Sequence, residues 1–289
     1  MTSDPRSRVI HGVGVFSGRP ATLTIAVGTR GLTWHASGDH EGVLASIGYV
    51  SPDTGWTGLP AGVPVRNTTI ASGGRTVATI EHVMGALAGS GVWNAAITLE
   101  GVESPILDGS AKDFVTLAAS LPRSSTSPLT LASPVEVRNG NASIIATPLA
   151  AGESLEYTYE LDYGPGAPIS PQRATWRGEA LDFANNIAPA RTFSLLKEVQ
   201  QARALGLFAH MKPADLLVIG DDGQPIDNSW RMEAEPARHK LLDLIGDLAL
   251  LGRPLRARVV ATRAGHALTH EFCRAVLRSL PSASGSALA

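Results

Sequence analysis

The first half of the chain begins with alternating apolar and polar residues, the pattern of half-buried β-strands. Apolar side chains take every second position over 23–27 and again over 32–36. Later the apolar spacing changes to that of a helix, over 80–88 and 111–120. The pattern therefore predicts strands first and helices afterwards.

The second half repeats this order. Leu155, Tyr157, Tyr159 and Leu161 alternate with other residues as in a strand. Strands that precede helices, without strict alternation of the two, favour an α+β fold over a doubly wound parallel sheet. The further expected elements are a helix at 195–205, a strand at 216–219, a helix at 236–251, a strand at 256–262 and a helix at 266–280.

The chain of 289 residues has room for about two domains, at roughly 150 residues each. Proline and serine crowd together at 120–128, between two better-patterned halves. We predict two α+β domains, over 1–122 and 128–280. A tail at 281–289, rich in small and polar residues, is expected to be flexible.

The composition gives no sign of a nucleic-acid or membrane partner. Lysine and arginine number 24 against 26 acidic residues, which gives a net charge of -2. No apolar run reaches the roughly 18 residues of a transmembrane helix, and the polar start lacks the apolar core of a signal peptide. The single cysteine, Cys273, forms no internal disulfide and is expected to be a buried apolar residue. A cytoplasmic location is therefore expected.

The helix expected near 236–251 carries the strongest chemical signal. His239, Asp243 and Asp247 follow at steps of four and share one stripe. Leucines and isoleucine cover much of the remaining surface of the helix, so this stripe is expected to be buried or to face a cleft. Buried carboxylates need a compensating cation or hydrogen-bond donors, and a divalent metal bound by His and Asp at i and i+4 meets that need. An ion-pair network without metal is the alternative.

The segment 79–89 is the best supplier of a further ligand. Thr79 is the expected N-cap and Gly89 or Gly91 the expected stop, which puts Glu81 and His82 in the first turn of a helix. A histidine ligand beside a glutamate suits metal-assisted hydrolysis, because the carboxylate takes a proton from water. Compensation of the helix dipole is the simpler interpretation of Glu81.

The other histidines carry weaker signals. His266 starts a helix directly after a strand, where loops often present catalytic groups. One turn later His270 is expected to face solvent. Four more have no histidine or carboxylate at ligand spacing: His11, His35, His40 and His210. The glycines of 12–18 lack the pattern of a phosphate loop and predict a tight turn between strands.

Five motifs in order resemble one family, the zinc-dependent UDP-3-O-acyl-N-acetylglucosamine deacetylases of lipid A synthesis. The resemblance covers about residues 9–280. Its motifs are Thr-Ile-Glu-His-Val-Met-Gly-Ala-Leu-Ala-Gly at 79–89, Pro-Ile-Leu-Asp-Gly-Ser-Ala at 105–111, Ala-Arg-Thr-Phe at 190–193, Arg-His-Lys-Leu-Leu-Asp-Leu-Ile-Gly-Asp at 238–247 and Gly-His-Ala-Leu at 265–268.

The resemblance implies a role for each matched residue. The Zn²⁺ ligands are His82, His239 and Asp243, and Fe²⁺ fits the same ligands. Glu81 is the general base and His266 the general acid that protonates the leaving amine. Thr192 helps to stabilise the oxyanion, and Asp247 orients and charges the catalytic histidine. Lys240 and Phe193 contact the substrate.

The resemblance also implies an architecture, namely two similar domains packed as a sheet/helix/helix/sheet sandwich, and a monomer. Two departures from the family pattern fall near the substrate. Phe16 stands where the family has histidine, and Phe208-Ala-His-Met211 replaces a Gly-Gly-Ser-like loop. They leave acyl-chain length open. The alternatives are a deacetylase for another acylated amino sugar and a non-catalytic relative that binds sugar nucleotides.

Overall fold

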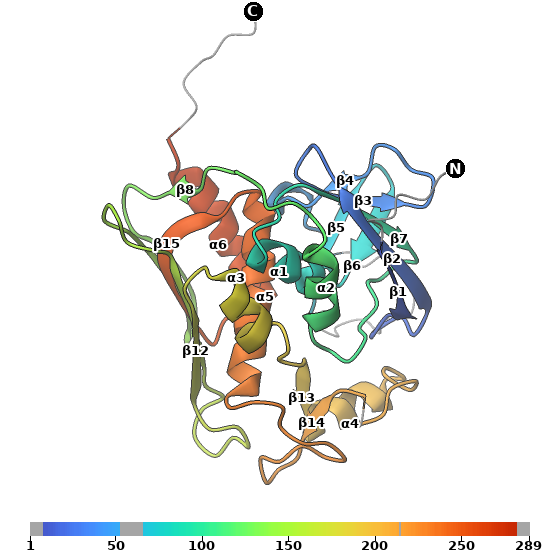
Figure 1. Cartoon of the computed structure of the whole chain (residues 1–289). Helices are drawn as coiled ribbons and strands as arrows, with labels where there is room; N and C mark the ends of the chain where they lie inside the picture. The colour runs from blue at the N-terminus through green and yellow to red at the C-terminus, as the bar shows by residue number, and fades with distance from the viewer. Residues whose placement is uncertain (1–7, 53–65, 214, 282–289) are drawn as a thin grey trace, which may run out of the picture.

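The computed structural model describes residues 8–52, 66–213 and 215–281. It contains two larger β-sheets with helices between them, so the α+β prediction is confirmed (Figure 1). Of the predicted flexible tail, residues 282–289 lie outside this range. In the described part of the chain, no helix has the length and apolar character needed to cross a membrane.

The first sheet has five strands in the order β1-β2-β7-β3-β4. In β2 the side chains of Leu23 and Ile25 are buried while their neighbours are partly exposed, as the period of two predicts. The pairs are antiparallel except β3 with β7. The bounds are β1 Arg8–Val13, β2 Pro20–Val27, β3 Leu32–Ala36, β4 Val43–Leu44 and β7 Ala95–Glu100.

The second sheet has the order β12-β11-β15-β10-β9, and the short strand β8 also pairs with β15. The strand β15 runs parallel to β11 and antiparallel to β10. The bounds are β8 Leu129–Thr130, β9 Val135–Asn139, β10 Ala142–Pro148, β11 Glu156–Leu161, β12 Gln172–Trp176 and β15 Leu255–Thr262. The segment 120–128 leads into β8, and the division into domains on either side of it stays a prediction.

Two further sheets have two strands each. The hairpin of β5 Thr69–Ser72 with β6 Arg75–Ala78 leads into the first helix. The parallel pair of β13 Phe193–Leu195 with β14 Leu217–Ile219 carries the helix α4 between its strands (Figure 1).

The long helices fill the space between the two large sheets (Figure 1). Every residue of α1 is buried, and so is most of α5. The bounds are α1 Glu81–Gly89, α2 Lys112–Ala118, α3 Ala180–Asp182, α4 Leu196–Ala204, α5 Glu235–Leu248 and α6 His266–Ser279, with short turns at Ile47–Tyr49, Phe183–Ile187 and Ala249–Leu251.

Two glycines allow α1 and α5 to pack at close range. A Cβ atom on Gly246 of α5 would lie 2.1 Å from the carbonyl oxygen of Glu81. A Cβ atom on Gly85 of α1 would lie 2.8 Å from Cδ1 of Leu242. At Gly246 the close atom belongs to the backbone, so a side chain there would displace the other helix, whereas at Gly85 the side chain of Leu242 would have to move. This contact places the first turn of α1 beside the polar stripe of α5.

The predicted start of α1 needs one correction. Thr79 is not the N-cap. That position belongs to Ile80, whose side chain makes no capping hydrogen bond. Instead Thr79 has a φ of 58°, and its hydroxyl donates to Glu103 and accepts a hydrogen bond from Asn67. The carboxylate of Glu103 also accepts from the backbone of the predicted tight turn after β1, at Phe16 and Ser17. That turn is confirmed.

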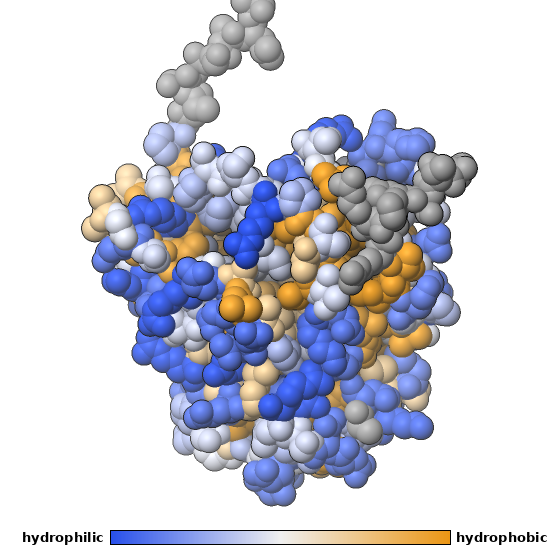
Figure 2. All heavy atoms as spheres, in the orientation of Figure 1, coloured by the Kyte–Doolittle hydropathy of each residue, from blue (hydrophilic) through white to orange (hydrophobic). Residues whose placement is uncertain are grey.

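Some of the exposed apolar side chains lie on the first sheet. Val9, Val13 and Val27 of β1 and β2 are exposed. Hydrophobic residues show on the flank where these strands lie, and hydrophilic residues cover much of the rest of this face (Figure 2).

Candidate active site

The polar stripe of α5 lies inside the molecule. His239, Asp243 and Asp247 are 1%, 6% and 1% exposed. The helix begins at Glu235, with Pro236 in its first turn as predicted, and Gly252 ends the turn that follows it with a φ of 74°. The spacing of four residues therefore brings three titratable groups onto one buried face, and each of them must find its partner within the protein.

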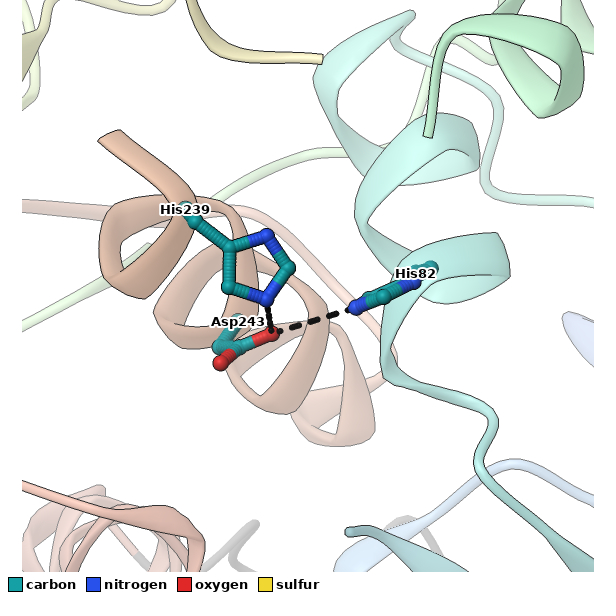
Figure 3. A group of neighbouring side chains, drawn as sticks. All are labelled: His82, His239 and Asp243. Atoms are coloured by element: carbon teal, nitrogen blue, oxygen red, sulfur yellow. Dashed lines mark ion pairs between the residues drawn. The ribbon is translucent and has the colours of Figure 1, made fainter. Parts of the chain in front are cut away.

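His82 on α1 meets the first two of these residues. Its Nε2 atom lies 3.6 Å from Oδ1 of Asp243, and Nε2 of His239 lies 3.4 Å from the same oxygen. Both rings point toward that oxygen (Figure 3). The two imidazoles meet edge to face, with centroids 4.9 Å apart.

The donor set of this group fits a divalent metal ion. Oδ1 of Asp243 is buried and has no hydrogen-bond partner among the described residues. One ligand atom from each of His82, His239 and Asp243 lies within 4.8 Å of the others. Two imidazole nitrogens and a carboxylate oxygen are ligands that Zn²⁺ and Fe²⁺ accept.

The protonation state of His239 also suits a metal ligand. Burial lowers its pKa to about 3, so the ring is neutral at physiological pH. Its Nδ1–H donates to the carbonyl oxygen of Ala190 at 3.1 Å, which leaves the lone pair of Nε2 directed at Asp243. Such a bond on the far nitrogen fixes the tautomer and orientation of a metal-binding histidine.

Lys240 binds the second carboxylate oxygen of Asp243. Its Nζ atom donates to Oδ2 at 2.8 Å. Burial alone would raise the pKa of Asp243, but Lys240 and His239 hold it well below its usual range. The lysine keeps its charge, because the attraction of Asp243 raises its pKa against the effect of burial. Asp243 is therefore a carboxylate with one oxygen paired to a cation and the other directed at two histidines.

His266 begins α6 and faces Asp247. Its Nδ1 atom lies 2.8 Å from Oδ2 of that carboxylate. Burial alone would lower the pKa of His266, but Asp247 raises it to about 9. Its Nε2 atom lies 3.9 Å from Oδ2 of Asp243, on the side of the ring away from Asp247. The structure thus brings a protonated imidazole next to the candidate metal group.

Glu81 is 4% exposed and accepts the backbone N–H of Thr68 at Oε2, at 3.0 Å. Burial raises its pKa, although His266 and His82 act in the opposite direction. A carboxylate whose pKa is raised in this way is a better proton acceptor than one in water. Its position in the first turn of α1 agrees with the sequence prediction.

The segment 190–193 is bound to the start of α5. Arg191 forms a buried ion pair with Glu235, at 2.8 Å between Nε and Oε1, and its backbone N–H donates to the same oxygen. Thr192 donates its N–H to the carbonyl of Gly109 at 2.7 Å. The ring centroid of Phe193 lies 6.4 Å from that of His239. These contacts hold Thr192 and Phe193 beside the histidine–aspartate group.

One cavity of about 360 Å³ joins these side chains. Its polar end is lined by Glu81, His82, Thr192, Phe193, His239, Lys240, Asp243 and His266. Asp247 does not line it and lies behind His266. The remaining wall is largely apolar and includes Val15, Phe16, Val199, Leu205, Leu207, Phe208, Met211 and Leu216.

The two segments that depart from the family pattern meet in this wall. The rings of Phe16 and Phe208 lie 5.5 Å apart between centroids. Both pack against a small apolar cluster of Val15, Ile106 and Met211. His210 donates from Nε2 to the carbonyl of Gly14 at 3.2 Å. The loop after α4 is thereby attached to the turn after β1.

The prediction that His270 faces solvent is wrong. This residue is 8% exposed, and its Nε2 atom lies 3.0 Å from the hydroxyl of Thr68. That hydroxyl also lies 2.5 Å from Oδ1 of Asp247. The four-residue step from His266 to His270 could have indicated a shared face, whereas no spacing of residues indicated the contacts of Thr68.

Comparisons with known proteins agree with the motifs. The sequence model of the LpxC family, described as UDP-3-O-acyl N-acetylglycosamine deacetylase, matches residues 5–278. A protein of that enzyme name from Anaeromyxobacter sp. (strain Fw109-5) is 35% identical over 92% of this chain and 84% of its own length. One from Chlamydia pneumoniae is 33% identical over 93% and 94%. One from Synechocystis sp. is 31% identical over 92% and 95%.

Proposed function

The chain belongs to the UDP-3-O-acyl-N-acetylglucosamine deacetylase family, and we propose from this that it hydrolyses the N-acetyl group of its sugar-nucleotide substrate. Water adds to the acetamide carbonyl, the bond from that carbon to nitrogen breaks, and acetate and a free amine are the products. The reaction belongs to lipid A synthesis. A cytoplasmic monomer is the form that the family resemblance supports.

The observation that carries this proposal is the meeting of a metal-ligand set, a proton acceptor and a proton donor in one cavity. His82, His239 and Asp243 form the ligand set, and Glu81 and His266 line the same cavity. Without a metal ion, Oδ1 of Asp243 is a buried oxygen that has no hydrogen-bond partner among the described residues.

We assign His82, His239 and Asp243 as the residues that hold the metal ion, with Zn²⁺ as the proposed occupant. When bound, the metal supplies Lewis acidity, which polarises a carbonyl oxygen and makes water a stronger acid. The attraction between Lys240 and Oδ2 of Asp243 keeps the ligand carboxylate charged over the working pH range.

Glu81 acts as the general base in this scheme. The backbone N–H of Thr68 donates a hydrogen bond to its Oε2 atom, so we assign Oε1 as the oxygen that accepts a proton from the attacking water. Burial makes the carboxylate more basic, which favours the transfer.

His266 acts as the general acid. Because its Nδ1–H is held by Asp247, its Nε2–H is the proton available to the departing amine. A pKa of about 9 keeps that proton in place at neutral pH. We assign the hydroxyl of Thr192 as a donor to the developing oxyanion, and Lys240 and Phe193 as substrate contacts, because all three line the polar end of the cavity.

The apolar wall of the cavity is the proposed site of the acyl chain. Phe16 and Phe208 form part of this wall and are in contact with each other. We propose that this pair limits the length of chain that the cavity accepts.

The experiment that tests the function measures zinc content and acetate release from UDP-3-O-(3-hydroxyacyl)-N-acetylglucosamine. We expect stoichiometric zinc and acetate release from the wild type, and the loss of both in His239→Ala. His40→Ala, a change at an exposed histidine, serves as the control and should keep both. Zinc without acetate release would indicate another substrate or a binding role, and absence of metal would overturn the proposal.

A further inference from the structure

Thr68 is buried where β5, α5 and α6 meet, and it contacts both sides of the proposed proton-transfer machinery. Its hydroxyl lies 2.5 Å from Oδ1 of Asp247, and its backbone N–H donates to Oε2 of Glu81 at 3.0 Å. The same hydroxyl lies 3.0 Å from Nε2 of His270 and 3.3 Å from Nδ1 of His266. Thr68 is 1% exposed, so water has little access to these groups and cannot easily replace the hydrogen bonds between them.

The chemistry of the groups decides the direction of these hydrogen bonds. A hydroxyl has one proton to donate and can accept as well, whereas a carboxylate only accepts. The proton of Thr68 therefore goes to Asp247. Toward His270 the same oxygen accepts, so Nε2 of His270 carries a proton and donates it. His270 thereby orients the hydroxyl of Thr68 toward Asp247.

These hydrogen bonds fix the orientation of the carboxylate of Asp247. Oδ1 is held by Thr68, while Oδ2 receives the Nδ1–H of His266 at 2.8 Å. A carboxylate held through both oxygens cannot turn about its own axis without breaking one of these bonds. The Nε2 atom of His266 is thus kept on the side facing the cavity.

We propose that Thr68 and His270 are positioning residues for the deacetylation, Thr68 setting the mutual placement of Glu81 and the Asp247–His266 pair and His270 orienting its hydroxyl. The inference rests on the function proposed above and adds two residues to it. Neither residue lines the cavity, so both act through the groups that do.

A purely structural role is the competing explanation, because buried polar groups form hydrogen bonds whether or not they assist a reaction. Such a role would alter folding, zinc content or substrate affinity. A positioning role alters turnover while these quantities stay unchanged. Pairs of variants that remove and restore one donor separate the two.

The first pair is Thr68→Val and Thr68→Ser. Valine keeps the volume and the backbone N–H but removes the hydroxyl, whereas serine restores it. We expect Thr68→Val to lower kcat by about 10- to 100-fold with KM and zinc content unchanged, and serine to recover most of the loss. Wild-type kcat in Thr68→Val, loss of zinc together with activity, or no recovery in Thr68→Ser would overturn the proposal.

The second pair, His270→Leu and His270→Gln, keeps the proposal testable if Thr68→Val fails to fold. Glutamine retains an N–H donor on a side chain of similar length, and leucine does not. We expect a lower kcat in His270→Leu and substantial recovery in His270→Gln. Equal kcat in the two variants would contradict a role for His270.

A readout without activity separates this inference from the proposed function. Nitrogen NMR of histidine-labelled, zinc-loaded full-length chain reports the proton on Nε2 of His270 and the environment of Nδ1 of His266. We expect both signals to shift in Thr68→Val and to return in Thr68→Ser. Unchanged signals in Thr68→Val would overturn the network even if acetate is released. Absence of acetate release in the wild type would overturn the proposed function, and the spectra would still decide on the network.

Discussion

Nδ1 of His266 lies 2.8 Å from Oδ2 of Asp247, and this contact joins the first residue of α6 to the last turn of α5. Each residue shifts the pKa of the other. Burial would raise the pKa of Asp247, but His266 and His270 hold it well below its usual range. The same attraction raises the pKa of His266. A histidine held in this way is cationic at neutral pH and can donate a proton from its other nitrogen.

The pH profile of the enzyme should reflect this pair. With a pKa of about 9, His266 keeps its proton at neutral pH and loses it on the alkaline side. We therefore expect kcat/KM to fall as pH rises through this range. Asp247→Asn removes the negative charge that raises the pKa, so the alkaline limb should move to lower pH. An unmoved limb in Asp247→Asn, measured over the same buffers, would exclude His266 as the group that titrates.

Glu81→Ala should reduce turnover without loss of metal. The residue contributes no atom to the candidate ligand group, which consists of His82, His239 and Asp243. A general base contributes about 10²- to 10⁴-fold, so a loss of this size in kcat is expected. Zinc analysis of the same sample provides the control. Activity that survives the change would remove Glu81 from the mechanism.

Removal of the metal should destabilise the fold as well as stop the reaction. A ligand that binds the native state and not the unfolded chain raises the free energy of unfolding. Thermal unfolding should therefore show a lower Tm after treatment with a chelator, and added Zn²⁺ should restore both Tm and acetate release. His239→Ala is the matched control, since chelator and zinc should leave its Tm unchanged. The same Tm response in that variant would indicate a metal site elsewhere.

Phe16→Ala should widen the range of acyl chains that the enzyme accepts. The change removes the ring that contacts Phe208 and opens the apolar wall of the cavity. We expect kcat/KM for substrates with longer chains to rise relative to that for shorter ones, and Phe16→Leu to change the ratio less. If both variants keep the wild-type ratio, the pair does not limit chain length.

Gly246→Ala should destabilise the contact between α1 and α5. A Cβ atom there would lie 2.1 Å from the carbonyl oxygen of Glu81, so the helices must separate. Overpacking of this kind costs about 1–3 kcal/mol in the free energy of unfolding, which urea denaturation measures. Gly48→Ala is the control, because the atom nearest to a Cβ there, Oγ of Ser46, lies 4.0 Å away. Equal stability of the two variants would contradict close packing at Gly246.

The regular elements could be predicted because their apolar positions are periodic. The period of two in β2 places Leu23 and Ile25 in the core. The step of four in α5 places His239 and Asp243 side by side, so that two of the three candidate ligands followed from spacing alone. Neither result depends on contacts distant in sequence.

Residues whose environment is made by distant segments could not be predicted in this way. His270 is buried because α6 packs against α5 and the segment before β5, which no pattern within α6 shows. Thr68 lies before a short strand and has no periodic neighbours. Thr79 has the residue type of an N-cap, but Glu103 and Asn67 bind its hydroxyl in a left-handed turn.

The measurement that tests the metal centre most directly is an anomalous-difference map from crystals of the zinc-loaded full-length chain, recorded at the zinc absorption edge. We expect one strong peak between Nε2 of His82, Nε2 of His239 and Oδ1 of Asp243. A map with no peak at these three atoms, or with its strong peak elsewhere, would contradict the assignment of this group as the catalytic metal site.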